Sequence, residues 1–240
     1  ALGDRVRFWI TINEPMVWIG HAYMKGIWPP QQKNILMYYK VLQNLIAAHK
    51  RAYDAIKSTR ADACVGIAKN NIYFDGGVIK YAMRWWWNHW FLNHIRNHQD
   101  FIGLNYYFHN RIKGFQFHQN ENKETSDMDW EICPEGIYHV LCDLKKYGTP
   151  IYITENGVAD AKDEKRARFI KDHLRWIAQA MQRGVDVHGY FYWSLLDNFE
   201  WEKGFEPRFG LVEMDYQTMA RKIRPSAFVY RDVINAASTE

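Results

Sequence analysis

The sequence has little cysteine and no concentrated block of positive charge. Its three cysteines, Cys64, Cys133 and Cys142, form no CxxC pair, so their spacing indicates neither a disulfide framework nor a zinc ribbon. The formal net charge is only +4, and no run of Lys and Arg exceeds a few residues. Because nucleic-acid binding normally requires a basic face that neutralises phosphates, we expect no nucleic-acid partner.

Long apolar runs are also absent. No segment approaches the roughly 18 to 20 consecutive apolar residues that a membrane span requires. The first residues, ALGDRVRF, do not resemble a signal peptide. We therefore expect no membrane association and a cytoplasmic location, although any leader would lie upstream of this sequence.

Aromatic residues, in contrast, are abundant, at 16% of the 240 residues. Such an excess either fills a large core or provides flat platforms for sugars or bases. The remaining composition, 48% hydrophobic and 24% charged, is typical of a globular protein. We predict one domain over residues 1–240, without internal repeats.

Five short apolar segments have the composition of buried parallel strands. They cover residues 6–12, 63–68, 101–107, 151–154 and 187–196. Helical patterns, with apolar residues three or four apart, separate them over residues 35–56, 134–147 and 166–183. This alternation predicts an α/β fold with a parallel sheet and outer helices. A polar stretch, residues 118–129, is predicted to be a mobile loop.

The first predicted helix has one apolar face. We expect this face to be formed by Leu36, Tyr39, Leu42, Leu45, Ile46, His49, Tyr53 and Ile56.

Polar side chains, expected to be unpaired, stand at the carboxyl end of every predicted strand. In parallel α/β folds this is the edge where chemistry is assembled, most consistently in (β/α)₈ barrels. The residues are Asn13 and Glu14, Lys69 and Asn70, Asn105, Glu155 and Asn156, and Asp197, Asn198 and Glu200.

Glu14 and Glu155 are the candidates for a catalytic pair, because each ends an apolar run without a basic neighbour. Two carboxylates on facing strand ends can divide acid and base roles if their environments separate their pKa values. Glycoside hydrolysis requires such a pair. The alternative is that each glutamate caps a helix or pairs with an Arg or Lys elsewhere in the chain.

The motifs around these glutamates resemble glycoside hydrolase family 1, the retaining β-glucosidases. The resemblance extends over nearly the whole chain and implies a (β/α)₈ TIM barrel, with about five βα units here that correspond to strands four to eight. The motifs are TINEP (11–15), GLNYY (103–107), PEG (134–136), ITENG (153–157), GYFYWSLLDNFEW (189–201) and RFGLVEMDYQT (208–218).

The resemblance implies a role for each matching residue. Glu14 would be the general acid/base and Glu155 the nucleophile, with their carboxyl groups about 5 to 5.5 Å apart. Asn13 would bind the sugar 2-OH, and Tyr107 would donate to Glu155 with Asn105 close by. The remaining sugar contacts would come from Trp193 as the platform beneath the ring and from Glu200 and Trp201, which would bind the outer hydroxyls of a terminal hexose.

The chain also departs from the family pattern. The Gln, Arg and His-Trp pair that follow the family's first three strands have no counterpart here, and the connection from Ala68 to Phe101 is unusually short. We therefore predict an incomplete barrel whose open edges associate with a missing N-terminal half or with a second copy of the chain. The alternative to an active enzyme is a catalytically impaired sugar-binding fragment that needs this half.

Three further features receive other interpretations. Lys69 is expected to be a solvated lysine at a strand end, the alternative being a Schiff-base lysine of an aldolase-like barrel. The run RWWWNHWF (84–91) is expected to pack as a helix, although an aromatic cleft near Trp85–Trp90 for a flat apolar ligand is a second hypothesis. His94 and His98 are expected on a surface helix, and we predict neither a metal site nor a required cofactor.

Overall fold

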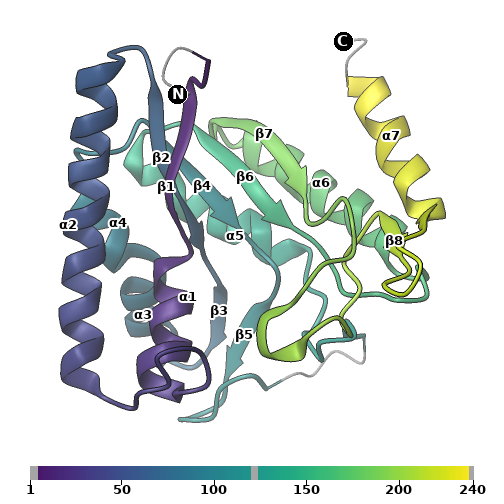
Figure 1. Cartoon of the computed structure of the whole chain (residues 1–240), viewed down its shortest axis with the longest axis horizontal. Coiled ribbons are helices and arrows are strands. Elements are labelled where there is room, and N and C mark those ends of the chain that lie inside the picture. The colour runs from purple at the N-terminus through teal and green to yellow at the C-terminus, as the bar shows by residue number, and fades with distance from the viewer. Residues whose placement is uncertain (1–4, 120–123, 238–240) are drawn as a thin grey trace.

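The centre of the fold is a five-stranded parallel sheet. The computed structural model describes residues 5–119 and 124–237, and the strands lie side by side in the order β1-β2-β4-β6-β7 (Figure 1). The five segments predicted from the sequence all form strands of this sheet, with ends that differ by a few residues. Their bounds are β1 (Phe8–Asn13), β2 (Cys64–Asn70), β4 (Phe101–Asn105), β6 (Ile151–Asn156) and β7 (Val187–Tyr192).

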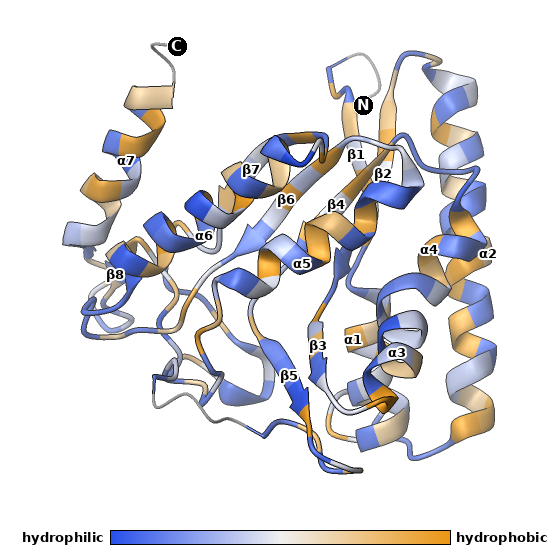
Figure 2. Cartoon of the chain, turned by 180° about the vertical axis from the view of Figure 1, so that it is seen from behind, coloured by the Kyte–Doolittle hydropathy of each residue, from blue (hydrophilic) through white to orange (hydrophobic). Residues whose placement is uncertain are grey.

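Helices connect these strands and cover one face of the sheet. Figure 1 shows α5 and α6 behind the sheet, and Figure 2, seen from the opposite side, shows them in front of it. The α-helices are α1 (Pro15–Ile19), α2 (Ile35–Thr59), α3 (Ile79–Met83), α4 (Trp90–Ile95), α5 (Glu135–Leu144), α6 (Arg166–Gln182) and α7 (Pro225–Ala237). The π-helices η1 (Gly20–Lys25) and η2 (Arg84–His89) and the 3₁₀-helices η3 (Lys145–Tyr147) and η4 (Trp201–Lys203) extend the connections.

Two small sheets, which the sequence patterns did not reveal, extend beyond the main one. Strands β3 (Tyr73–Gly76) and β5 (His109–Ile112) pair in parallel, each following a strand of the main sheet. Strands β8 (Val212–Met214) and β9 (Arg221–Ile223) form an antiparallel pair after the β7 loop. Both sheets have strands of only three or four residues, which is too short for a recognisable alternation.

The core lies between the sheet and its helices. Central-strand residues such as Ile67, Leu104 and Ile153 are fully buried there against Leu42 of α2 and Leu141 of α5. The central strands β2 and β4 are buried on both faces and therefore read as continuous apolar runs. Burying each Leu or Ile side chain contributes roughly 1.5–3 kcal/mol.

The buried face of α2 differs from the predicted one. Leu36 is 78% exposed and Tyr39 is 45% exposed, whereas Tyr38 is buried with Leu42, Ile46 and His49. The helix begins at Ile35, where the Asn34 side chain accepts hydrogen bonds from the amides of Leu36 and Met37. Residues of this first turn therefore lie at the exposed end of the helix, where the periodic pattern no longer predicts burial.

The opposite face of the sheet keeps large apolar side chains exposed at both of its edge strands. Phe8 and Ile10 on β1 are 50% and 47% exposed, and Phe191 on β7 is 58% exposed. Between the edges, the rings of Phe8, Phe101 and Tyr152 pack edge to face, with centroids 5.4–6.0 Å apart. Such exposed rings are unusual for a sheet face in contact with water only.

Two sequence predictions concern loops and membrane spans. Of the predicted loop at 118–129, residues 120–123 lie outside the described residues. Across the described part of the chain, no helix combines the length and the apolar character that crossing a bilayer would require.

Candidate active site

Glu14 occupies the junction between β1 and α1. Its backbone is left-handed, with φ 47° and ψ 54°, and its amide donates to Ala68 O at the end of β2 (2.9 Å). Pro15 then begins α1, and the Glu14 side chain makes no capping bond to that helix. A non-glycine residue with positive φ is uncommon and is frequently found at functional sites. Because the Glu14 side chain makes no capping bond to α1, the alternative that Glu14 caps a helix is wrong.

Glu14 and Glu155 are brought together through Asn105. The Asn105 Nδ2 donates to Glu14 Oε1 at 3.0 Å and to Asn13 Oδ1 at 3.1 Å. In the neighbouring strand, Asn105 is the register partner of Glu155. The hydroxyl of Tyr107 donates to Glu155 Oε2 at 2.6 Å. Four of the predicted site residues thus surround Asn105, at the common carboxyl end of β1, β4 and β6.

Thr154 and Asn70 support this arrangement, and the sequence analysis did not assign them a role. The Thr154 hydroxyl donates to Asn105 Oδ1 at 2.6 Å, which turns the Asn105 NH₂ group toward Glu14. Asn70 is the register partner of Asn105, and its side chain accepts a hydrogen bond from Trp87 Nε1 at 3.2 Å. The signals in the sequence were the position of Thr154 directly before Glu155 in the ITENG motif and the position of Asn70 at the end of a predicted strand.

The two glutamates are both difficult to ionise. Burial raises the pKa of Glu14 above its ordinary value, although hydrogen bonds from Asn105 and Asn70 and the charge of Lys69 act against it. Burial, with the charge of Glu14, raises the pKa of Glu155 to about 7. Two such carboxyls lose their protons in two coupled steps, so the pair retains one proton over part of the range near neutral pH.

Glu200 lies within electrostatic reach of the same pair. Burial, together with the charges of Glu14 and Glu202, raises its pKa to about 7. The phenol of Tyr107 responds to the same carboxyls. Burial and the charges of Glu155, Glu14 and Glu200 raise its pKa well above the ordinary value. The charge of Glu14 thus acts on two carboxyls from other strand ends, those of Glu155 and Glu200.

Trp201 takes part in a stack of three rings with Trp28 and His21. Its ring stacks on Trp28 with centroids 4.1 Å apart, and Trp28 stacks on His21 at 4.4 Å. The indole N–H of Trp28 also donates to Glu202. Trp28 follows η1 and Trp201 begins η4, so this stack joins the loop near β1 to the loop after β7. The sequence carried no signal for the Trp28 contact.

Trp193 lies at the end of β7 beside the Glu155 strand. It is half-buried, and its amide donates to Asn156 O at 3.0 Å. A Cβ atom at Gly157 would lie only 1.9 Å from Trp193 O, so only glycine fits at this position of the ITENG motif. The neighbouring segments 155–157 and 193 are thereby packed against each other.

Lys69 was predicted to be a solvated lysine at a strand end, and this prediction was wrong. Its side chain is fully buried (0% exposed), its Nζ donates to Asn70 O at 2.6 Å, and the ring of Trp87 lies 5.3 Å from Nζ. Burial lowers the pKa of Lys69 to about 7, against the opposing charge of Glu14. The sequence could not reveal this because a strand end is exposed or buried according to the helix that packs over it, here η2.

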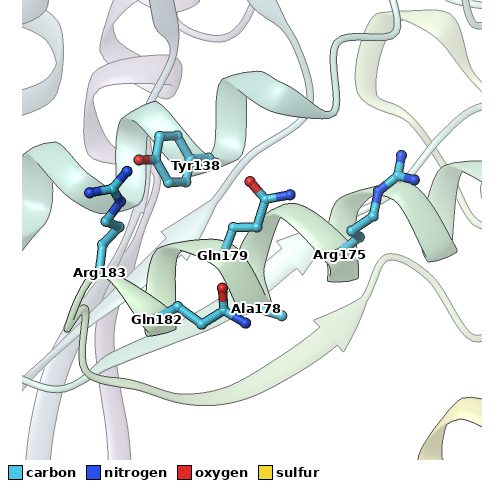
Figure 3. A pocket seen from close by; sticks show the side chains of 6 residues that line it. All are labelled: Tyr138, Arg175, Ala178, Gln179, Gln182 and Arg183. Atoms are coloured by element: carbon cyan, nitrogen blue, oxygen red, sulfur yellow. The ribbon is translucent and has the colours of Figure 1, made fainter.

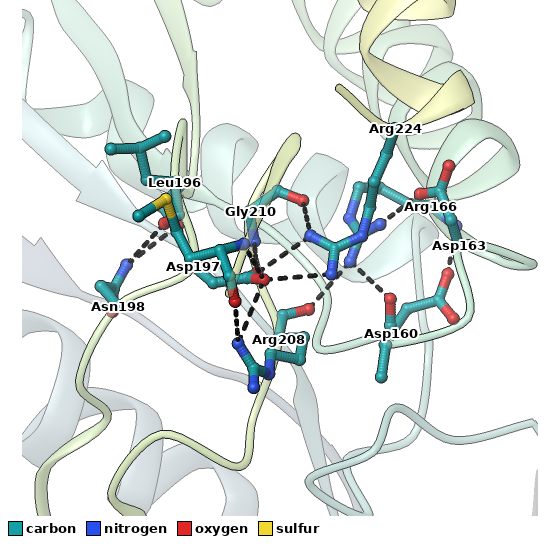
Figure 4. A network of polar contacts seen from close by, with 12 residues as sticks. Asp160, Asp163, Arg166, Leu196, Asp197, Asn198, Arg208, Gly210 and Arg224 are labelled. Atoms are coloured by element: carbon teal, nitrogen blue, oxygen red, sulfur yellow. Dashed lines mark hydrogen bonds and ion pairs between the residues drawn. The ribbon is translucent and has the colours of Figure 1, made fainter. Parts of the chain in front are cut away.

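Asp197 was also predicted to be unpaired, and this prediction was wrong. It follows the same strand as Glu200. Its carboxylate accepts bonds from Arg224 Nη1 and Nη2 at 2.9 and 3.1 Å and from the Gly210 amide at 2.8 Å (Figure 4). Burial raises the pKa of Asp197, but the bonds from Arg224 and Gly210 outweigh it and lower the pKa overall. This residue fixes the loop that carries Glu200.

A shallow hollow of about 730 Å³ lies elsewhere, on the outer surface of the helices (Figure 3). It is formed by Tyr138 of α5 with residues of α6, among them Arg175 and Arg183. None of the predicted site residues lines it, so it is separate from the carboxylates.

The remaining sequence candidates form packing contacts. Residues 84–95 are helical as expected, and the ring of Trp86 packs against Tyr39 of α2 at 5.8 Å. The flat-ligand hypothesis for Trp85–Trp90 stays a prediction. His94 is exposed on α4, as predicted, and its Nδ1 bonds to Trp90 O at 2.7 Å. His98 lies beyond the end of α4 at Ile95, so the prediction that it belongs to a surface helix was wrong. Within residues 5–119 and 124–237, no group of three or more His, Cys, Asp or Glu side chains is arranged to hold a metal ion.

Comparison with known sequences gives a consistent result. The glycosyl hydrolase family 1 profile matches residues 1–74 and 90–239. The chain is 36% identical to a β-galactosidase of Sulfolobus acidocaldarius, over 97% of this chain and 55% of that protein. It is 35% identical to β-glucosidase A of Thermotoga maritima, over 97% of this chain and 64% of that protein. The chain thus spans about 55–64% of the length of these relatives.

Solved structures show the same relationship. A β-glucosidase from Thermotoga maritima in complex with glucoimidazole matches with a TM-score of 0.90 and 32% identity, over 98% of this chain and 64% of that one. A β-glycosidase from Pyrococcus horikoshii matches with a TM-score of 0.89 and 36% identity, over 97% and 61%. These relatives are (β/α)₈ barrels, the fold predicted from the motifs. With its parallel sheet, its paired glutamates and these matches, the chain belongs to glycosyl hydrolase family 1.

Proposed function

We propose that this protein is a retaining β-glycosidase that hydrolyses terminal, non-reducing β-D-glycosides. Glu155 attacks the anomeric carbon and forms a glycosyl-enzyme while Glu14 protonates the leaving oxygen. Glu14 then removes a proton from the water that releases the sugar. The observation that carries this proposal is the link from Glu14 through Asn105 to Glu155, with Tyr107 bonded to the Glu155 carboxylate.

The hydrogen bonds support this division of roles. The Tyr107 hydroxyl at 2.6 Å stabilises negative charge on Glu155 and so favours its ionised form as the nucleophile. The proton that the pair retains then resides on Glu14. Once Glu155 is esterified its charge is lost, the pKa of Glu14 falls, and Glu14 acts as the base.

The other site residues bind the sugar. Asn13 bonds to the 2-OH, Trp193 forms the platform beneath the ring, and Glu200 and Trp201 bind the outer hydroxyls. Trp201 directly follows Glu200, whose pKa responds to the charge of Glu14, and this supports the role. Because the pKa of Glu200 is about 7, its charge is complete only above neutral pH, where it would most strongly disfavour a 6-phosphate.

We also propose that further strands close the sheet into a barrel, supplied by an N-terminal half or by a second copy of the chain. The exposed rings of Phe8 and Phe191 at the two edge strands support this. Light scattering should then give a mass above that of one chain. A well-folded monomer would contradict the proposal, and a cytoplasmic location remains a prediction.

An inactivator experiment tests the catalytic proposal directly. The protein is treated with a 2-deoxy-2-fluoro-β-glucoside that carries an activated leaving group, and digested peptides are analysed by mass spectrometry. We expect the label on Glu155, since its ester is slow to hydrolyse when the 2-position bears fluorine. A label on another residue would remove the assignment.

Turnover provides the second measurement. Hydrolysis of a chromogenic β-glucoside should fall by about 10⁴-fold in Glu155→Gln, whereas Glu213→Gln, at an exposed position of β8, should match the parent. If the parent chain does not turn over but binds glucoside, the alternative of an impaired fragment that needs the other half is favoured.

A further inference from the structure

Lys69 is a buried cation that the proposed mechanism does not yet use. It lies near the carboxyl end of β2 with no exposed side-chain surface, its Nζ bonds to a backbone carbonyl, and the face of Trp87 lies beside it. In the described part of the chain it forms no ion pair. A buried ammonium is costly unless a nearby negative charge compensates for it.

The negative charge nearest in the fold is Glu14. Strands β1 and β2 are paired, and the Glu14 amide donates to Ala68 O, so Glu14 leaves the sheet directly beside the backbone of Lys69. From the other elements, the ionisable groups that act on Glu14 or respond to its charge are Tyr107, Glu155 and Glu200. These three are acidic, whereas the positive charge that acts on Glu14 comes from Lys69.

The two charges affect each other reciprocally. The charge of Lys69 lowers the pKa of Glu14, and the charge of Glu14 raises the pKa of Lys69. When Glu14 gives up its proton, the ammonium form of Lys69 becomes more stable, and the buried pair becomes neutral overall.

We propose that Lys69 is a positioning residue that stabilises the carboxylate form of Glu14; this inference deepens the proposed function and rests on it. In the first step the Glu14 proton moves to the leaving oxygen as the bond from C1 to that oxygen breaks and the bond from Glu155 to C1 forms. The negative charge left on Glu14 is then balanced by Lys69. In the second step Glu14 takes a proton from water as the water oxygen bonds to C1 and the ester to Glu155 breaks. Lys69 acts through Glu14 and touches no reacting atom.

The test measures the Glu14 titration itself. The protein is labelled with [δ-¹³C]glutamate, the Glu14 signal is assigned by its loss in Glu14→Gln, and chemical shifts are followed against pH. We expect Lys69→Met to raise the pKa of Glu14 by about 1–3 units, the size of effect that an adjacent opposite charge has. An unchanged Glu14 titration would overturn the proposal.

Two lysine variants serve as controls. Lys57→Met removes a half-buried lysine that pairs with Asp100 at the amino end of the sheet (3.0 Å), and it should leave the Glu14 titration unchanged. Lys69→Arg keeps the charge and should titrate close to the parent. A shift in Lys69→Arg as large as in Lys69→Met would show that packing is responsible, which also overturns the proposal.

A second measurement leaves Lys69 in place, in case its variants fail to fold. With ¹⁵N-labelled lysine, the Lys69 pKa should fall in Glu14→Gln, because the coupling is reciprocal. No change there contradicts the proposal, as does reductive trapping of a keto sugar on Lys69 by borohydride, which would indicate a Schiff-base lysine. None of these titrations requires turnover, so they test the Lys69 proposal separately from the proposed function. The titrations can contradict the role of Lys69 even if the inactivator labels Glu155, and they can support it even if Glu155 is not labelled.

Discussion

Two groups of buried acidic side chains lie close together at the carboxyl end of the sheet, and they differ in what neutralises them. Among the site carboxylates, Glu14 accepts a hydrogen bond from the Asn105 amide and Glu155 accepts one from the Tyr107 phenol, while Glu200 is affected by the charge of Glu14. Asp197, which follows the same strand as Glu200, is instead enclosed by the guanidinium of Arg224 and by backbone amides.

This difference displaces the pKa values in opposite directions. Burial, with the charge of Glu14, raises the pKa of Glu155 and Glu200 to about 7. For Asp197 burial acts in the same sense, but Arg224 and Gly210 reverse it. Acids that burial affects in the same sense thus either remain reactive near neutral pH or hold the structure together, according to their partners.

The largest expected effect comes from removing the paired acid. Asp197→Ala leaves Arg224 buried without its partner, so it should lower the free energy of unfolding by about 3–5 kcal/mol, measured by urea denaturation. Asp232→Ala removes an exposed partner of Arg231 and should change it by less than about 0.5 kcal/mol. Equal effects of the two substitutions on the free energy of unfolding would show that the buried pair of Asp197 and Arg224 does not stabilise the fold more than an exposed pair.

The pH dependence of stability should separate the two groups. The folded state holds extra protons on Glu155 and Glu200 between their ordinary pKa of 4.5 and about 7, so their contribution to the free energy of unfolding is lost as the pH rises through this window. The contribution of Asp197 is instead lost as the pH falls below 3.8, through its lowered pKa. Denaturation at a series of pH values measures both. Between pH 4.5 and 7 the free energy of unfolding should fall more in the parent than in Glu155→Gln. An equal fall in both proteins would contradict the raised pKa of Glu155.

A smaller effect is expected from neutralising one site carboxylate. At pH 8 Glu200 is ionised without a cation, so Glu200→Gln should stabilise the protein by on the order of 1 kcal/mol while weakening sugar binding. At pH 5 the gain should disappear, because Glu200 is then protonated. Glu213→Gln is the matched exposed control, and a gain that persists at pH 5 would point to packing instead of charge.

An effect of similar size concerns the ring stack of His21, Trp28 and Trp201, which joins the loop near β1 to the loop after β7. Trp28→Leu removes the stacking with Trp201 and His21 and should cost about 1 kcal/mol. It should raise KM for a β-glucoside more than it lowers kcat, because the loop that carries Glu200 loses a contact. Trp85→Leu, in an exposed ring on η2, is the control. Identical kinetics in both variants would show that the stack does not order the site.

The sequence predicted the main sheet well because its central strands β2 and β4 are buried on both faces and read as apolar runs with polar ends. It failed where local pattern and tertiary packing differ. Tyr38 instead of Tyr39 is buried on α2, and the short strands of β3, β5, β8 and β9 have no periodicity of their own. The site residues in the TINEP and ITENG motifs were recognisable, whereas Trp28 was not, since its partner Trp201 comes from the far end of the chain.

The sequence by itself determined the strand order along the chain, the family, and the two glutamates that end apolar runs, because these depend on local patterns and motifs. Only the tertiary structure decided which buried charges face one another. It buries Lys69 beside Glu14 and directs Arg224 to Asp197. The physical reason is that the pKa of a buried group is set by its desolvation and by charges within a few ångströms, and those neighbours come from strands that are distant in the sequence.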